Sequence, residues 1–227
     1  MSIGFRVMNR KRVVSAELVD RFRLIPTANI SDVMNRMTAG GPRLRPYHSG
    51  GAMCGPALTV KTRPGDNLMV HMALTMIQPG DIIVIDAGGD LTNSLIGERM
   101  ISKAMHRGAG GFVVNGAIRD LDWVSANSIP VFGAGVNHRG PYKSGPGEIN
   151  VPVAIDGMVI EPGDLVIGDG DGLICIPIDE ARELYEKAHA KHEEESSTFA
   201  DLGKIDQAEE YKKLSASLKA MGCEFES

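Results

Sequence analysis

An arginine followed directly by an aspartate, Arg119-Asp120, is the pair in this sequence whose side chains could act together on a small oxo acid. A guanidinium group can hold a carboxylate through two parallel hydrogen bonds. A carboxylate is a hard oxygen ligand for Mg²⁺ or Mn²⁺, and Mg²⁺ tends to keep several of its waters. The pair could therefore bind the carboxylate and the keto oxygen of a 2-oxo acid. Taken alone, the dipeptide favours an ordinary turn at a strand end, because Arg-Asp is a common pair.

The stretch around this pair, residues 86–122, has the pattern of an anion site. A glycine-rich segment, Asp86-Ala87-Gly88-Gly89-Asp90, ends a strand, and Gly97-Glu98-Arg99-Met100 opens a helix. A further strand then leads into the turn 116–120 that contains the Arg-Asp pair. Backbone N–H groups converge at the start of a helix, and the helix dipole adds positive potential there. We therefore expect an anion to bind near residues 97–100.

The elements that must position these residues are short β-favouring runs separated by glycine and proline turns. Two helices are expected between the runs, over 67–77 and 95–107. In the recurring Pro-Gly-Asp turns, proline presets φ at the first turn position and glycine supplies positive φ at the next. The alternation indicates a mixed α/β domain. The expected strands cover residues 57–62, 82–86, 112–115, 131–132, 151–155, 158–160, 165–167 and 173–176.

Helices are predicted on both sides of this region. Ser15 suits the N-cap of a helix with an apolar stripe of Leu18, Val19 and Phe22. A second helix is expected from about Ser31, with an apolar face of Val33, Met34 and Met37. The charged, helix-favouring segments 179–199 and 205–221 predict a helical tail, which lies either on the domain or on a neighbouring subunit.

Composition narrows the class of protein. A formal net charge of −5 argues against a protein that binds nucleic acid. The short basic run 10–12 is expected to be solvated. Three scattered cysteines indicate reduced thiols rather than a disulfide framework. No apolar run approaches the ~18 residues of a membrane helix, and the N-terminus lacks the apolar core of a signal peptide. We expect a cytoplasmic protein without a membrane partner.

Several motifs occur in order and resemble the RraA-like / 4-hydroxy-4-methyl-2-oxoglutarate aldolase family. They are Gly-Gly-Asp at 88–90, Gly-Glu at 97–98 and Gly-Ala-Ile-Arg-Asp at 116–120. Downstream, Pro-Val-Phe-Gly-Ala-Gly-Val at 130–136, His-Arg-Gly-Pro at 138–141 and Gly-Pro-Gly-Glu at 145–148 match the same family, as does the stretch 159–177. The resemblance covers roughly residues 25–178.

The resemblance implies a fold and an assembly. The expected fold is a swivelling β/β/α-type domain with a β-barrel-like core over residues 1–178, followed by a C-terminal helical extension over 179–227. Family members look like homotrimers or dimers of trimers with sites between subunits. We therefore expect a homo-oligomer.

The resemblance also assigns roles. It implies that Arg119 binds the substrate carboxylate and supports the enolate, and that Asp120 holds a divalent metal, Mg²⁺ or Mn²⁺. It places a backbone-amide cradle for substrate on Gly97, Glu98, Arg99 and Met100, with the Glu98 side chain orienting a water. One departure is that the family usually has an acidic residue three positions after the metal aspartate, where this chain has Trp123. Either Asp122 substitutes with a shifted geometry, or the metal has one fewer water partner.

The function implied by the resemblance is metal-dependent retro-aldol cleavage of a 4-hydroxy-2-oxo acid. 4-Hydroxy-4-methyl-2-oxoglutarate and 4-carboxy-4-hydroxy-2-oxoadipate are the expected substrates, and pyruvate is the expected product. Oxaloacetate decarboxylation passes through the same enolate and is expected as a side activity. The alternative is a protein without chemistry that regulates a ribonuclease by protein–protein contact, as members of the same family do.

Overall fold

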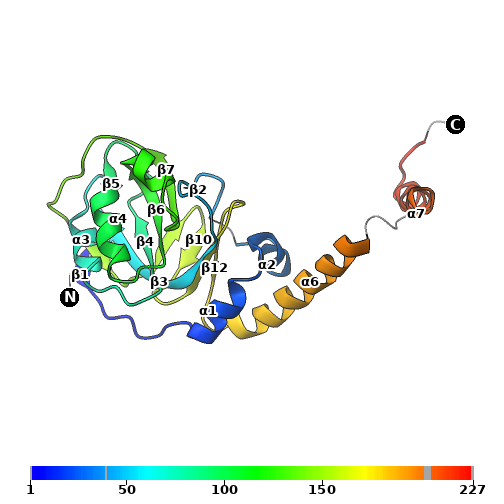
Figure 1. The fold of residues 1–227 in the computed structure, drawn as a ribbon, viewed down its shortest axis with the longest axis horizontal. Coiled ribbons are helices and arrows are strands. Elements are labelled where there is room, and N and C mark those ends of the chain that lie inside the picture. The colour runs from blue at the N-terminus through cyan, green and yellow to red at the C-terminus, as the bar shows by residue number, and fades with distance from the viewer. Residues whose placement is uncertain (1, 39, 202–205, 226–227) are drawn as a thin grey trace. The chain divides into compact units, whose positions relative to one another are not determined.

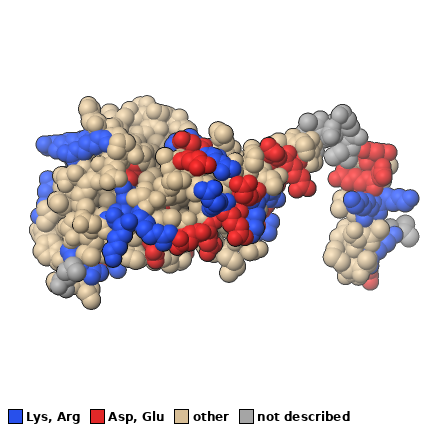
Figure 2. Space-filling model, turned by 90° about the horizontal axis from the view of Figure 1, so that it is seen from below, with Lys and Arg blue, Asp and Glu red and all other residues tan. Residues whose placement is uncertain are grey.

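A computed structural model describes residues 2–38, 40–201 and 206–225 of the 227-residue chain. Its contacts form one compact unit over Met1–His189 and a second over Ala190–Ser227. Within the first unit, helices flank a large sheet (Figure 1). Of the described helices, none combines the length and the apolar character needed to cross a membrane. The face drawn in Figure 2 carries patches of both signs of charge.

The described residues contain a ten-stranded mixed sheet, with strands paired in the order β1-β8-β3-β4-β6-β7-β2. Strands β11 and β12 continue from one end of β3, β5 pairs with β6, and β9 and β10 form a separate hairpin. Because β1 and β2 end the pairing path, this sheet is open. The expected α/β class is confirmed, without a closed barrel. The bounds are β1 Phe5–Val7, β2 Arg45–Pro46, β3 Met53–Thr62, β4 Ile82–Asp86, β5 Ser94–Ile96, β6 Gly111–Ile118, β7 Val131–Val136, β8 Gly147–Ile149, β9 Val153–Ile155, β10 Met158–Ile160, β11 Leu165–Gly168 and β12 Leu173–Ile176.

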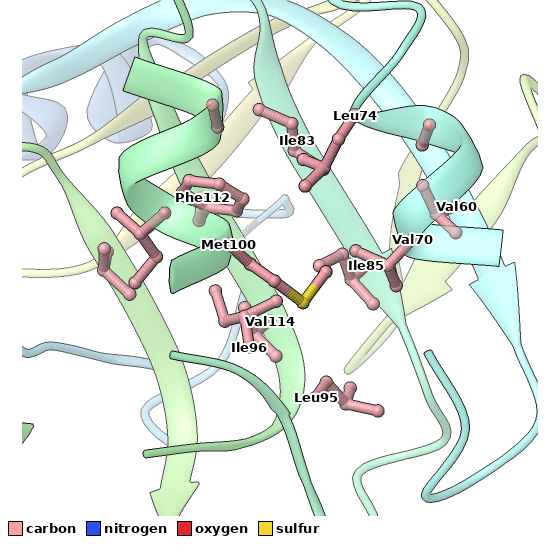
Figure 3. Packing of buried hydrophobic residues seen from close by; sticks show 14 of the residues in the cluster. Val60, Val70, Leu74, Ile83, Ile85, Leu95, Ile96, Met100, Phe112 and Val114 are labelled. Atoms are coloured by element: carbon pink, nitrogen blue, oxygen red, sulfur yellow. The ribbon is translucent and has the colours of Figure 1, made fainter. Parts of the chain in front are cut away.

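The central strands β3, β4, β6 and β7 run parallel, so their carboxyl ends meet at one edge of the sheet. Parallel neighbours need crossover connections, and three short helices supply them: α3 (Leu68–Ala73), α4 (Glu98–Met105) and α5 (Leu121–Ser125). Figure 3 shows how α3 and α4 pack on the sheet: Val70 and Met100 lie beside Ile85, and Leu74, which follows α3, lies beside Ile83. This buried cluster holds the helix starts against the strand ends.

Helices α1 (Ala16–Phe22), α2 (Thr27–Val33) and α6 (Ala181–Asp201) belong to a different part of the fold. The Ser15 hydroxyl accepts from the Leu18 amide, which confirms the predicted N-cap. Phe22 and Tyr185 meet edge to face with ring centroids 5.3 Å apart. The first two turns of α6 therefore pack on the domain, together with α1, β11 and β12.

The tail is helical as predicted, and the boundary between the two compact units of the chain falls within α6, after His189. In the second unit, α7 (Gln207–Ala220) is N-capped by Asp206, whose carboxylate accepts from the Ala208 amide. Ile205, the predicted start of this helix, lies outside the described residues. Among the described residues of this unit, five large apolar side chains are exposed: Tyr211, Leu214, Leu218, Met221 and Phe225.

The structure corrects several sequence predictions of local structure. The helix expected from Ser31 is α2 and begins four residues earlier, because the Asp169 carboxylate accepts from the Thr27 amide and hydroxyl and caps it from a distant turn. Met37, expected on its apolar face, is exposed. The helix expected over 95–107 begins at Glu98, since Ser94–Ile96 pairs with β6 as β5. Arg10, expected to be solvated, forms a buried ion pair with Asp81 at 2.7 Å.

Candidate active site

A cavity of about 310 Å³ opens where the helix starts meet the strand ends. Asn67 and His71 line it from α3, and residues 94–97 line it from β5 and its connection to α4. Arg119 reaches it from the end of β6, and the loop 140–143 closes another side. The cavity therefore collects segments far apart in the sequence, among them the predicted Gly97, Arg99, Met100 and Arg119.

Four cationic side chains line this cavity: Arg99, Lys103, Arg119 and Lys143. Among the described residues that line it, none is acidic. Burial lowers the pKa of His71, and the charges of Lys143, Lys103 and Arg99 lower it further. A cavity with this lining favours an anionic ligand, even though the chain carries a net negative charge.

Asp120 follows β6 in the left-handed conformation, with φ 59° and ψ 43°. Its Oδ2 atom accepts a hydrogen bond of 2.9 Å from the Glu98 amide. The Arg119 Nε atom lies 3.8 Å from the same oxygen, and the Arg119 amide donates to the Ile96 carbonyl at 3.0 Å. The end of β6 is thereby tied to the start of α4, and the two side chains remain 43% and 40% exposed.

Gly97 allows this close approach. Its φ of −163° and ψ of −170° are extended backbone that any residue adopts, so the requirement for glycine is steric. A Cβ atom here would overlap the Asp120 carboxylate and would lie 2.7 Å from Cγ of Arg119. The absence of a side chain at Gly97 thus sets the position of both predicted site residues.

The predicted amide cradle over Gly97–Met100 is partly used by the protein itself. The Glu98 amide serves Asp120, and the Met100 amide donates to the Gly97 carbonyl at 3.0 Å. The Met100 side chain packs in the core beside Ile85 and Val70 (Figure 3). The Glu98 side chain is exposed and does not line the cavity.

Asp120 suits a hard divalent cation because its carboxylate is partly exposed and one oxygen is already oriented by an amide. Among the described residues, no group of three or more acidic, histidine or cysteine side chains could hold a metal ion. A Mg²⁺ ion here would take its remaining ligands from water and substrate, as this ion commonly does. Trp123 packs half-buried against the core, and Asp122 lies exposed in the first turn of α5.

Two buried residues beside the site, Asp66 and Asn67, were not predicted from the sequence: Asp66 ends the turn at 64–66, and Asn67 follows it. Asp66 is fully buried and accepts hydrogen bonds from the amides of Leu68, Ser144 and Gly145. Burial acts to raise the pKa of Asp66, but these backbone bonds outweigh it and lower the pKa. Asp66 therefore ties the loop that carries Lys143 to the start of α3. The Pro-Gly-Asp motif was a signal for the turn, but not for this contact.

Asn67 is the second. It is 2% exposed and lines the cavity. Its Nδ2 atom donates to the Leu95 carbonyl at 2.8 Å and lies 3.2 Å from Sδ of Met100. Its Oδ1 atom has no hydrogen-bond partner among the described residues. An unpaired buried acceptor costs ~1–3 kcal/mol, so such atoms require an explanation.

A larger hollow of about 720 Å³ lies between the N-terminal segment and the start of α6. Its arginines are engaged, Arg12 with Asp179 and Arg6 with Glu148. None of the predicted site residues lines it. The smaller cationic cavity is therefore the better candidate for chemistry.

Comparison with known proteins places the chain in a family. The model of the RraA-like family, described as Aldolase/RraA, matches residues 27–175. A Halalkalibacterium halodurans protein, provisionally named a 4-hydroxy-4-methyl-2-oxoglutarate aldolase, is 39% identical over 80% of this chain and 86% of its own. An Arabidopsis thaliana protein with the same provisional name is 35% identical over 59% of this chain and 80% of its own.

Solved structures share the fold. A Pseudomonas syringae protein superposes with a TM-score of 0.77 at 25% identity, covering 88% of this chain and 98% of its own. Streptomyces coelicolor RraAS2, described as an unusual member of the RNase ES inhibitor RraA family, gives a TM-score of 0.75 at 26% identity, with coverage of 84% and 98%. The RNA-processing inhibitor RraA from Thermus thermophilis gives 0.62 at 27% identity, with coverage of 67% and 92%.

Proposed function

Because the chain belongs to the RraA-like family, we propose that it is an aldolase that cleaves a 4-hydroxy-2-oxo acid to pyruvate and a second 2-oxo acid, with Mg²⁺ or Mn²⁺ as cofactor. The provisional names of the relatives give the substrate class, with 4-hydroxy-4-methyl-2-oxoglutarate as the first candidate. 4-Carboxy-4-hydroxy-2-oxoadipate, which carries one more carboxylate, is the second. Oxaloacetate decarboxylation is the proposed side activity.

The observation that carries the proposal is the close approach of Arg119 and Asp120 to Gly97, where Gly97 and Arg119 line the cationic cavity and Asp120 lies next to them outside its lining. Substrates with two or three carboxylates suit this lining. Arg119 holds the carboxylate next to the keto group and stabilises negative charge as it develops on the keto oxygen. Lys143, from the loop 140–143, would neutralise a distal carboxylate.

Asp120 would hold the divalent cation through its carboxylate. Such a cation supplies Lewis-acid polarisation of the 2-keto group. The Glu98 amide fixes the Asp120 carboxylate, so the rotamer of Asp120 is set before a cation binds. A water takes the proton from the C4 hydroxyl, and the resemblance assigns its orientation to the Glu98 side chain.

Pyruvate release tests the proposal. The protein is assayed with 4-hydroxy-4-methyl-2-oxoglutarate and with oxaloacetate, in Mg²⁺ or Mn²⁺, and again after exhaustive chelation. We expect turnover of both substrates with the metal, its loss with chelator, and its return when metal is added. Undiminished turnover after chelation would contradict the metal dependence, and no turnover of either substrate would contradict the aldolase.

A second candidate function is regulation of a ribonuclease by protein–protein contact. It is favoured by the structural similarity to the RNA-processing inhibitor RraA and to RraAS2. The two candidates differ in their need for Arg119. Arg119→Lys should lower aldolase turnover about 10²–10³-fold, whereas inhibition of a purified ribonuclease should survive that change.

A further inference from the structure

The Asn67 amide has one end fixed and one end unused. Its Nδ2 atom is held by the Leu95 carbonyl, which lines the cavity and belongs to β5. This bond sets which end of the amide is the acceptor, because a carbonyl oxygen demands a donor. The Oδ1 atom is left without a partner among the described residues, although Asn67 is at the N-cap position of α3, where this oxygen would ordinarily accept from a helix amide.

We propose that Asn67 is a positioning residue: its Oδ1 accepts a hydrogen bond from the water that takes the C4-hydroxyl proton of the substrate. The proposal rests on the aldolase function proposed above. It assigns to Asn67 the orienting role that the family resemblance gives to Glu98. The structure favours Asn67 because it lines the cavity and has a buried, unused acceptor, whereas the Glu98 side chain is exposed outside the lining.

An amide oxygen accepts a hydrogen bond but is too weakly basic to remove a hydroxyl proton, so a water must lie between Asn67 and the substrate. When one O–H of that water points at Oδ1, a lone pair is left to face the C4 hydroxyl. The hydroxyl proton passes to the water as the C4–O bond becomes a carbonyl. The C3–C4 bond breaks, and its electron pair forms the pyruvate enolate. The water returns the proton to C3, so no proton is gained or lost overall.

Oxaloacetate decarboxylation separates this role from a structural one. In that reaction CO₂ leaves from a carboxylate, and no hydroxyl proton is removed in the step that breaks the C–C bond. Loss of the orienting bond should therefore slow the aldol cleavage and leave the decarboxylation nearly intact. A general loosening of the cavity would slow both reactions together.

The experiment compares Asn67→Leu with wild type on 4-hydroxy-4-methyl-2-oxoglutarate and on oxaloacetate. We expect kcat for aldol cleavage to fall by about 100-fold, the lower part of the range for a positioned proton acceptor. Decarboxylation should fall by no more than about fivefold, which is a small change in barrier height.

Asn93→Leu is the matched control. Asn93 is also buried, and its Nδ2 donates to the carbonyl of Gly140 in the cavity wall, but its Oδ1 already accepts from the Thr92 hydroxyl. This variant should lower both activities by similar factors. The assignment would be overturned if Asn67→Leu lost both activities equally. It would also be overturned if Glu98→Gln lost aldol cleavage selectively while Asn67→Leu did not. Wild-type protein that turns over neither substrate would instead refute the proposed function on which the assignment rests.

Discussion

Replacing Gly97 with alanine should separate activity from stability. The new Cβ would lie 2.7 Å from Cγ of Arg119 and would overlap the Asp120 carboxylate. An ordinary van der Waals contact begins at 3.4 Å, so Arg119 must retreat by 3.4 − 2.7 = 0.7 Å, and Asp120 by more. A misplacement of about 1 Å can cost about 100-fold in rate. Because the backbone of Gly97 is extended and both displaced side chains are about 40% exposed, unfolding free energy should fall by less than about 1 kcal/mol.

Two measurements on purified Gly97→Ala check this prediction. Steady-state pyruvate release should show a drop in kcat of about 100-fold, while the urea midpoint should move little. Gly170→Ala is the control, because a Cβ at Gly170 meets nothing within 4 Å and the residue lies away from the cavity; both of its values should equal wild type. A Gly97→Ala variant with wild-type turnover would refute the argument that this glycine sets the positions of Arg119 and Asp120.

Further predictions concern the metal, the buried carboxylate and the tail. Asp120→Asn should weaken Mn²⁺ binding in a calorimetric titration. Arg119→Lys should bind Mn²⁺ as wild type does, while its turnover falls about 10²–10³-fold. Equal metal affinity in wild type and Asp120→Asn would show that Asp120 is only a turn residue. Asp66→Asn should lower the free energy of unfolding, measured in urea, by about 2–4 kcal/mol, because three backbone donors lose a charged acceptor. The pKa of Asp66 is lowered on folding, so its contribution to the unfolding free energy is present above the unfolded pKa of 3.8 and is lost as pH falls through the lower folded value. If the loss of stability at acid pH were the same in Asp66→Asn as in wild type, this argument would be contradicted. In light scattering, wild type should have the mass of a homo-oligomer, a trimer or a dimer of trimers. Truncation after His189 spares the buried turns of α6 and should lower that mass if the tail assembles subunits. A mass of 24.3 kDa for the wild type would exclude the oligomer.

The parts of the fold that local sequence dictates were predictable. Strand 82–86 combines continuous apolar residues with a preceding Pro-Gly-Asp turn, and the structure places β4 over Ile82–Asp86. Ser15 caps α1 because the acceptor and the donor are three residues apart. Each of these features is decided by residues adjacent in the chain, so propensity and turn chemistry suffice.

The errors have long-range causes. The start of α2 is set by Asp169, which is 142 residues away from Thr27, and the buried partner of Arg10 is 71 residues away. The same limit applies to the site. The Arg-Asp pair and the glycine at 97 were found through ordered motifs, but Asn67 and Lys103 join the cavity only because α3 and α4 pack on one face of the sheet. A lone asparagine after a turn gives no sign of an unused acceptor.

Trp123 makes the protein its own spectroscopic reporter. It is the sole tryptophan of the chain and packs half-buried against the core, three residues beyond Asp120 and within α5, the helix that Asp120 begins. Indole emission responds to small changes in local polarity, so a ligand at Asp120 that shifts α5 would be seen by intrinsic fluorescence in the unlabelled protein. The residue that departs from the family pattern thus supplies a signal that relatives with an acid at this position lack there.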